Sequence, residues 1–583
     1  MSIRKKLMGF WSNRLSTKEQ VERELKDLPE ALKYWECTPS VRSYIDGSRE
    51  KEWRKYDDFQ AAIPIKGAQL KELLDAGHVP IPSKWVDTIK NFHDRLKPDY
   101  KPEFKSRLVS CGNFEDSTEV RTDAPTSDLE THALVAAFAS CHGVPEESSD
   151  IRNAYFQAEP IDRVVLMRQP SGGLPGVDPE AMLLIRVPVY GLCDSGRGFW
   201  RKVDREARDV GFQVSRIFPA FYFYREGGKV VCVLTTHVDD FLWASIGKGG
   251  TIIDRLLKKF EVGRRESERL RFCGKQFDRS GNDVLIDVTD NTNKITYIDI
   301  KPHRKHTDPV DKGEERQLRS VVGSLSWISR QARPDILYRV SKLQSSIKGA
   351  TISTLHEANK VLELALKGRD LKLRYRNGPF DFDHLGVLTA SDASFAGESN
   401  NRSQQGRIHF LVPADQLREP QRTNYDVMVV SFASTTIKRV CRATLQAETY
   451  ALQNAQESGD RIRAAWAELY GHGSRGTDWE LNARTFVPHV CLTDCRSLAD
   501  HLNTEAPARV QDKRLQIELS ALRQSIFNED GVRTSEAYPR GGDRVDWVDT
   551  STQIADCLTK SMKPDFLIKV LYSGVYTVSR EKL

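Results

Sequence analysis

With 583 residues, the chain is too long for a single hydrophobic core, and about three or four domains are expected. Charged residues make up 29% of the sequence, and 87 Lys and Arg against 81 Asp and Glu give a net charge of +6, which permits nucleic-acid binding without requiring it. No long apolar run predicts a membrane span. The ten cysteines form no C-x-x-C pair or Cys/His cluster of the zinc-finger kind, which favours free thiols in a reducing environment.

The sequence pattern predicts a helix near the start of the chain, followed by a region of both strands and helices. STKEQVERELKDLPEALKYW predicts a helix capped by Ser16 or Thr17. From about residue 51 to 300, short strands alternate with helices, and the glycine pair in YREGGKVV predicts a hairpin turn. DVLIDVTDNTNKITYIDI is interpreted as strands joined by a turn.

The second half begins helical and then becomes mixed again. Residues 310–380 carry a helical pattern. After residue 384, HLGVLTASD, GRIHFLV and DVMVVSFAST predict three strands, and TLQAETYALQNAQESGDRIRAAWAELYG predicts a long helix. HVCLTD predicts a further strand that leads into the helix RSLADHL.

Two adjacent aspartates, Asp239 and Asp240, interrupt the apolar segment VLTTHVDDFLWASI. Aspartate is depleted in strands, and neighbouring carboxylates repel each other unless a cation lies between them. Three interpretations compete here: a hairpin turn, a solvated loop, and a site for a hard divalent cation such as Mg²⁺. The metal site requires at least one further acid elsewhere in the chain.

Asp150 in SSDIRNAYFQAEP is the candidate for that acid, because an aspartate at the end of a strand can meet the Asp pair across a sheet. Three carboxylates around two cations could clamp the attacking and leaving oxygens of a phosphoryl transfer. Tyr155 is an aromatic residue that could lie under a bound sugar and reject a 2′-hydroxyl. Lys105 and Arg107 are candidates for phosphate contacts, although a solvated basic strand explains that stretch equally well.

A second set of acids follows residue 384. Asp392 and Asp494 end predicted strands, Glu448 lies inside the long predicted helix, and Asp556 stands near the start of another predicted helix. Each alone is typical of a surface acid. A strand end delivers its side chain to the rim of a sheet, however, and a helix packed on that sheet can present a glutamate to the same point.

Several segments resemble, in order, the blocks of the Ty1/copia-type retrotransposon reverse transcriptase. The resemblance covers about residues 52–565, and its specificity comes from the order of the blocks rather than from any one of them. The segments are KSRLVSCG, TDAPTSDLETHALVAAFAS, SSDIRNAYFQAEPIDRVVLMRQPSGG, VYGLCDSGRGFW, HVDD, RSVVGSLSWISRQARPDI and SDASFAG.

This resemblance implies an α+β, multidomain protein. A polymerase right hand with fingers, palm and thumb would be followed by a helical connection and an α/β ribonuclease H-like domain. The implied ranges are 1–50 for an N-terminal polar helical segment, 51–305 for the reverse transcriptase, 306–380 for the connection, 381–565 for the ribonuclease H-like domain and 566–583 for a tail.

The resemblance also implies roles for the candidate residues. Asp150, Asp239 and Asp240 would be the metal-binding catalytic acids of an RNA-directed DNA polymerase, Tyr155 its steric gate, and Lys105 and Arg107 basic residues of the fingers. The Asp-Glu-Asp-Asp set of ribonuclease H is matched by Asp392, Glu448, Asp494 and Asp556.

Cofactors and partners follow from these roles. Each active site would hold two Mg²⁺ or Mn²⁺ ions. The implied partners are an RNA template, a DNA primer, deoxynucleoside triphosphates and RNA–DNA hybrids, with no membrane, and the oligomeric state is left open. The expected location is cytoplasmic particles, with access to the nucleus possible.

The sequence departs from the family pattern at several positions. His237 replaces the usual Tyr before Val-Asp-Asp, Cys193 and Asp194 lie in a block that usually reads Leu-Lys-Gln-Ala, and Cys111 replaces an Arg. In the nuclease part, Arg514 and Leu515 stand where the family has a His.

These departures define a rival hypothesis, a retroelement remnant that binds nucleic acid without polymerising. Since none of the seven acids is lost, the active enzyme is favoured. No protease motif or paired zinc ligands are found, so the chain is expected to be the C-terminal polymerase portion of a Pol polyprotein, whether processed, truncated or decayed.

Overall fold

The computed structural model describes residues 24–25, 27–95, 97, 99–397, 401–471, 479–504, 510–527 and 543–581. The predicted helix cap at Ser16 or Thr17 lies outside these ranges. Within them, contacts divide the chain into two compact units, one within Met1–Pro125 and Arg152–Glu206, the other within Thr126–Ile151 and Ala207–Leu583. Each unit is therefore built from segments that are not contiguous in sequence.

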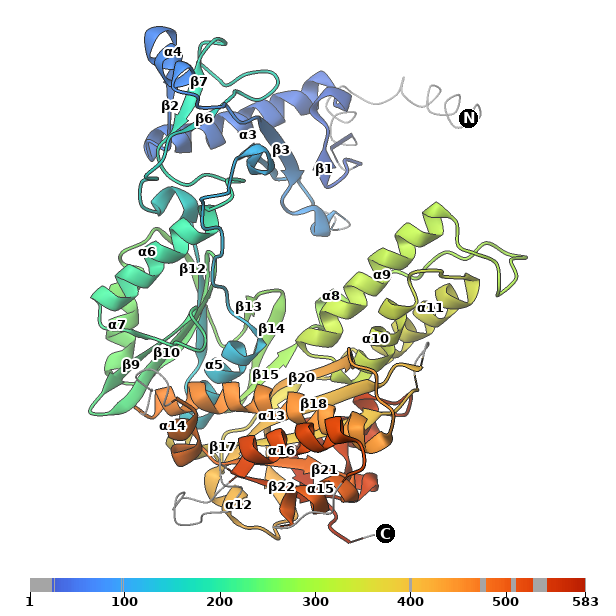
Figure 1. The fold of residues 1–583 in the computed structure, drawn as a ribbon. Coiled ribbons are helices and arrows are strands. Elements are labelled where there is room, and N and C mark those ends of the chain that lie inside the picture. The colour runs from blue at the N-terminus through green and yellow to red at the C-terminus, as the bar shows by residue number, and fades with distance from the viewer. Residues whose placement is uncertain are drawn as a thin grey trace. The chain divides into compact units, whose positions relative to one another are not determined.

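The first unit contains two small antiparallel sheets (Figure 1). Helix α3 (Pro39–Asp58), which begins with a Thr38 cap and a proline in its first turn, packs on strand β4. The core of this unit includes Trp53, Tyr56 and Leu108. The sheets are β1 (Ala31–Leu32), β3 (Ser83–Ile89) and β4 (Phe104–Ser110), and β2 (Ala62–Ile65), β7 (Met182–Ile185) and β6 (Val165–Met167).

A six-stranded antiparallel sheet begins the second unit. Its strand order is β12-β5-β11-β10-β9-β8. The predicted hairpin at Gly227 and Gly228 is confirmed, because both glycines have positive φ angles between β9 and β10. The strands are β5 (Glu146–Ile151), β8 (Gln213–Val214), β9 (Phe221–Glu226), β10 (Lys229–His237), β11 (Asp240–Ser245) and β12 (Val262–Ser267).

Helix α5 (Leu129–His142) packs on this sheet at β10 and β11 and also contacts β20 of a second sheet. Residues 131–140 are buried all round the helix, and many of them are alanines, which allow neighbours to approach from both sides. The helix begins with a capping box formed by Asp128 and Thr131. Because α5 is covered on both sides, one large hydrophobic core includes residues of both sheets.

The helical stretch predicted for residues 310–380 is confirmed by α9 (Lys312–Gln331), α10 (Leu337–Ser345) and α11 (Ile352–Lys367). The strand predicted at the end of DVLIDVTDNTNKITYIDI is wrong. After β15 (Asp283–Asp287), the Asp287 side chain accepts a hydrogen bond from the backbone N–H of Thr289, and a short helix, α8 (Thr289–Asn293), follows. Asp and Asn favour such capped turns over a continuing strand.

A five-stranded mixed sheet, in the order β20-β18-β17-β21-β22, forms the C-terminal part of the second unit. Strand β17 pairs antiparallel with β18 and parallel with β21. The long helix α13 (Thr444–Leu469) lies against β17 and β18 (Figure 1). The strands are β17 (Leu385–Ser394), β18 (Gln404–Pro413), β20 (Met428–Thr436), β21 (His489–Thr493) and β22 (Arg544–Trp547).

This combination of separate sheets and helical segments confirms the predicted α+β, multidomain class. None of the helices in the described part of the chain combines the length and the apolar composition that a membrane-spanning helix needs.

Candidate active sites

The β10–β11 hairpin explains the two adjacent aspartates. His237 and Asp240 are directly paired, so only Val238 and Asp239 form the loop. Val238 has φ +57°, a left-handed conformation in which a β-branched residue is strained, usually at a cost of about 1–3 kcal/mol. The hairpin-turn interpretation is therefore correct. It does not exclude the metal site, because the tight turn holds Asp239 and Asp240 at the end of the sheet.

Asp150 is the cross-strand partner of Asp240 on β5. Residues in such a pair point to the same face of a sheet, and like charges in this arrangement repel. The pKa of Asp240 is raised to about 6, mainly by burial and then by the charges of Asp239 and Asp150. The structure thus brings the three predicted acids together at one sheet end, in an arrangement that a cation would stabilise.

Gly263 on the neighbouring strand β12 leaves the space that the Asp150 carboxylate occupies. A Cβ atom at position 263 would collide with both carboxylate oxygens of Asp150. The β12–β5 pairing is irregular between Val262 and Arg265, and Gly263 lies in this irregular stretch. A glycine here therefore determines where the carboxylate of Asp150 can lie.

The second set of acids meets at the rim of the five-stranded sheet. Asp392 lies near the end of β17, and Asp494 directly follows β21. Because these strands are parallel, their carboxyl ends share one edge. Asp556 reaches the same edge from a predicted helix that proves to be a short 3₁₀ helix, Ile554–Leu558. Among the described residues, these three acids alone each offer a ligand atom within 4.8 Å of the others.

Glu448 of α13 completes this second set. Its carboxylate accepts a hydrogen bond from the backbone of Ala393, and its pKa is raised well above the usual value by burial and by the charges of Asp392 and Asp494. The Oε2 atom is buried without a hydrogen-bond partner among the described residues. Burying an unpaired carboxylate oxygen is costly, and a divalent cation is a suitable partner for it.

Lys560 is a functional neighbour that the sequence reasoning missed. Its ammonium lies 2.7 Å from Asp556 Oδ1 and 3.5 Å from Asp392 Oδ2. Thr559 donates a hydrogen bond to Asp392, and Thr550 donates one of 2.8 Å to Asp494 Oδ2. Burial raises the pKa of Asp392, Asp494 and Asp556, and the Lys560 charge partly offsets this effect.

The candidate substrate residues lie in the first unit. Lys105 and Arg107 are two residues apart on β4, so their side chains share one face. The Arg107 guanidinium lies 4.9 Å from the ring centroid of Tyr190, and that ring is in T-shaped contact with Tyr155 at 5.2 Å. Tyr190, which the sequence reasoning did not single out, thus links Arg107 to Tyr155.

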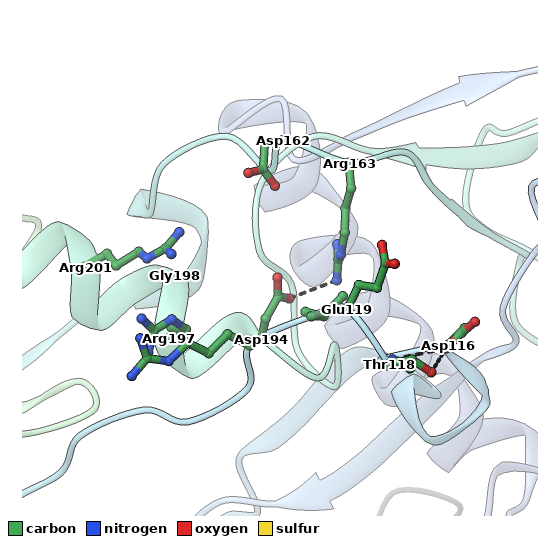
Figure 2. A pocket seen from close by; sticks show the side chains of 11 residues that line it. Asp116, Thr118, Glu119, Asp162, Arg163, Asp194, Arg197, Gly198 and Arg201 are labelled. Atoms are coloured by element: carbon green, nitrogen blue, oxygen red, sulfur yellow. Dashed lines mark hydrogen bonds and ion pairs between the residues drawn. The ribbon is translucent and has the colours of Figure 1, made fainter.

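The departure at Asp194 lines a charged cavity of about 680 Å³ in the first unit (Figure 2), and Cys193 precedes it in the sequence. Arg163 bonds Asp194 Oδ1 at 3.0 Å and Glu115 Oε1 at 2.5 Å. Its Nη2 atom also lies 4.0 Å from Cys193 Sγ, and burial raises the pKa of that thiol to about 11. Asp194 is therefore an ion-pair partner of Arg163 rather than an unpaired acid.

The remaining departures occupy ordinary structural positions. Cys111 follows β4, and its backbone N–H donates to the carbonyl of Pro82 at 2.8 Å. Arg514 is exposed in the first turn of α16 (Lys513–Phe527), while Leu515 is buried in an apolar cluster. Neither arrangement disturbs the positions of the acids.

Comparison with known families agrees with this geometry. Residues 72–296 match the family described as reverse transcriptase (RNA-dependent DNA polymerase). This segment is a reverse transcriptase domain. Enzymes of this family are nucleotidyltransferases that depend on divalent metal ions. The reverse transcriptase domain contains Lys105, Arg107, Tyr155 and the acids Asp150, Asp239 and Asp240.

Relatives extend the likeness beyond the reverse transcriptase domain. The chain is 24% identical over 551 residues to the retrovirus-related Pol polyprotein from transposon RE1 of Arabidopsis thaliana, a match that covers 89% of this chain and 33% of that protein. The polyprotein from transposon RE2 of the same plant is 24% identical over 457 residues, covering 73% of this chain and 29% of its own. The chain therefore spans about a third of the length of these relatives.

A solved structure of the foamy viral protease-reverse transcriptase in complex with double-stranded DNA aligns with 86% of this chain and 70% of its own, at 12% identity and a TM-score of 0.49. The Pol polyprotein relatives, together with the reverse transcriptase domain, confirm the resemblance to copia-type Pol polyproteins.

Proposed function

We propose that this chain is an RNA-directed DNA polymerase that also cleaves the RNA strand of RNA–DNA hybrids. The observation that carries the polymerase is the direct pairing of Asp240 with Asp150, beside Asp239, within a reverse transcriptase domain. The proposal of nuclease activity rests on the four acids that lie together at the rim of the five-stranded sheet. RNA template, DNA primer, deoxynucleoside triphosphates and the hybrid are the proposed partners.

The polymerase residues have distinct tasks. Asp150, Asp239 and Asp240 would hold two Mg²⁺ or Mn²⁺ ions, which supply charge neutralisation at the transferring phosphoryl group. Tyr155 would lie against the sugar of the incoming nucleotide, and its bulk would exclude a 2′-hydroxyl. Lys105 and Arg107 would bind phosphate oxygens, and the contact with Tyr190 would hold the Arg107 guanidinium in place.

In the nuclease, Asp392, Glu448, Asp494 and Asp556 would hold the ions, whose chemistry there is to make a bound water acidic enough to attack a phosphodiester. The chain supplies the geometry: parallel strands place Asp392 and Asp494 at one edge, and α13 brings Glu448 to it. The buried Glu448 Oε2 atom has no protein partner among the described residues and is free to be a ligand.

The test of the polymerase is extension of an oligo(dT) primer on poly(rA) with Mg²⁺, and with Mn²⁺ in parallel. A variant with Asp239→Asn and Asp240→Asn is the control. We expect extension by the wild type alone. If the folded wild type extends no primer with either metal, the polymerase assignment is wrong.

The rival function is a remnant that binds hybrids without polymerising. It predicts strongly salt-dependent hybrid binding with no metal-dependent turnover. The departures on which it rests have well-defined partners in the structure, since Asp194 pairs with Arg163 and His237 bonds to Ser127 at 3.2 Å. This favours the active polymerase.

Gly263→Ala is expected to reduce primer extension on the order of tenfold or more, because the added methyl group must displace the Asp150 carboxylate. Ribonuclease H activity measured on the same protein should not change. Gly323→Ala, on α9, is the matched control, because neither Gly263 nor Gly323 has a positive φ and a Cβ at position 323 meets nothing within 4 Å. Normal extension by the Gly263→Ala protein would show that Asp150 does not need this space.

A further inference from the structure

A series of hydrogen-bonded polar side chains, buried at Lys275 and His132 and half-buried at Ser127, leads to His237 beside the turn of the proposed polymerase hairpin. Ser127 Oγ lies 3.2 Å from His237 Nδ1 and 2.9 Å from His132 Nε2. The Nδ1 atom of His132 in turn hydrogen-bonds the amine of Lys275. The four residues come from the segment before α5, from α5 itself, from β10 and from β14 (Lys275–Ser280).

Ser127 also holds the hairpin by its backbone. Its N–H donates to the carbonyl of Thr236 at 2.9 Å, one residue before His237. The adjoining turn contains the strained Val238, and the charges of Asp239 and of Asp150 on β5 both repel Asp240. A hairpin with these unfavourable features needs contacts from outside to keep a single conformation.

At the other end of this series of side chains, burying the amine of Lys275 is energetically costly. Lys275 is completely buried and forms no ion pair with any described carboxylate. Burial lowers the pKa of Lys275 to about 7, although Cys273 in its own hairpin and Asp128 and Glu130 at the start of α5 act in the opposite direction. His132 is buried too, with its ring in T-shaped contact with Phe272 at 5.0 Å. Apolar side chains would fill this space at lower cost.

His237 shares a face with the acids. It is the cross-strand partner of Asp240, which is itself the partner of Asp150, so the three side chains point to the same side of the sheet. The Nδ1 atom of His237 is engaged by Ser127, and no described residue bonds its Nε2 atom. The orientation of the imidazole beside the acids is therefore set by Ser127.

We propose that Ser127, His132 and Lys275 are positioning residues of the polymerase site, which fix the imidazole of His237 and the hairpin that carries Asp239 and Asp240. This inference rests on the proposed polymerase function. It means that His237, which departs from the family pattern, is held in place by three residues of this protein. It also explains why the amine of Lys275 is buried, which packing alone does not.

The decisive variant is the double substitution His132→Leu with Lys275→Met, which removes both buried polar groups together. Replacing both partners with apolar groups is often neutral or stabilising, so Tm should stay level or rise. If these residues position His237, kcat of the double variant for primer extension should nevertheless fall at least about tenfold, with KM for dTTP nearly unchanged. Ser127→Ala should act in the same direction, and His132→Gln, which keeps a polar group facing Ser127, should retain more activity than His132→Leu.

Thr235→Val is the matched control. It removes the hydrogen bonds of the Thr235 hydroxyl to Thr131 of α5 at 3.0 Å and to the Ala220 carbonyl at 3.2 Å without touching His237, and kcat should remain at the wild-type value. If the double variant keeps both kcat and KM, the proposal is overturned.

A second readout does not depend on activity. The ¹⁵N–¹H signals of the His237 imidazole, identified by their loss in His237→Gln, should shift in the double variant and in Ser127→Ala. Unchanged signals would overturn the positioning role. If the signals shift but the wild type extends no primer, the proposed polymerase function is wrong. The conclusion that Ser127, His132 and Lys275 hold His237 in place is then still correct.

Discussion

Replacing Asp239 with asparagine is expected to abolish DNA synthesis and to leave RNA cleavage intact. Asparagine keeps the size of the side chain and suits the same turn, so the hairpin should form. The substitution removes one of the charges that would hold the metal ions. Losing about 4 kcal/mol of transition-state stabilisation corresponds to roughly a 1,000-fold lower rate.

Primer extension and cleavage of a labelled RNA–DNA hybrid, measured on the same preparation, test this separation. Asp290→Asn is a suitable control, because Asp290 is an exposed acid on α8 that pairs with Arg271 and belongs to neither set of candidate acids. If the Asp239→Asn protein retained both activities, Asp239 would not be a catalytic acid. Loss of both activities would indicate a folding defect and would be seen as a lower Tm.

Glu448→Gln is expected to move stability and activity in opposite directions. Glutamine removes a buried charge that lies beside Asp392 and Asp494, so the metal-free protein should have a higher Tm than the wild type. Hydrolysis of the RNA strand should fall on the order of 1,000-fold, because a proposed metal ligand is lost. Primer extension should be unaffected.

The pH dependence provides an independent check. The folded-state pKa of Glu448 is raised above its ordinary value of 4.5, so the folded state holds this proton more tightly than the unfolded chain does. In EDTA, the free energy of unfolding should therefore fall as pH rises from about 4.5 through the raised folded-state pKa. Asp392, Asp494 and Asp556 contribute with the same sign.

Thermal unfolding at several pH values, with EDTA or with Mg²⁺, measures this effect. The decline should be shallower in Glu448→Gln, and Mg²⁺ should stabilise the wild type more than the variant. Equal stabilisation of both proteins by Mg²⁺ would show that Glu448 is not a metal ligand.

The sequence was informative where acids interrupt apolar strands. Asp239 and Asp240 could be placed at a hairpin because the glycine pair fixed the preceding turn, and Asp392 and Asp494 could be placed together because both end strands. The roles of all these acids stay predictions. Their proximity in the fold is what the structure adds.

Other features depend on contacts between residues far apart in the sequence, which a single sequence does not reveal. Gly263 matters because of an irregular register between β12 and β5. Tyr190 matters because its ring contacts both Arg107 of β4 and Tyr155 of a 3₁₀ helix. The strand predicted at ITYIDI was wrong: a turn held by the Asp287 side chain leads into the short helix α8, and residues 295–300 form no strand after it. The predicted domain ranges follow chain order, whereas the compact units combine non-contiguous segments, so those boundaries remain predictions.

The ammonium of Lys560, between Asp392 and Asp556, has a consequence for how the proposed nuclease site would acquire its ions. Because a lysine of the chain already neutralises part of the cluster, this half can fold in metal-poor surroundings. An arriving divalent ion would displace the Lys560 ammonium from these carboxylates, so the first of the proposed ions adds one unit of positive charge there rather than two. We therefore expect the ion to bind weakly and to exchange readily with free ions in solution, so that it binds during turnover rather than permanently.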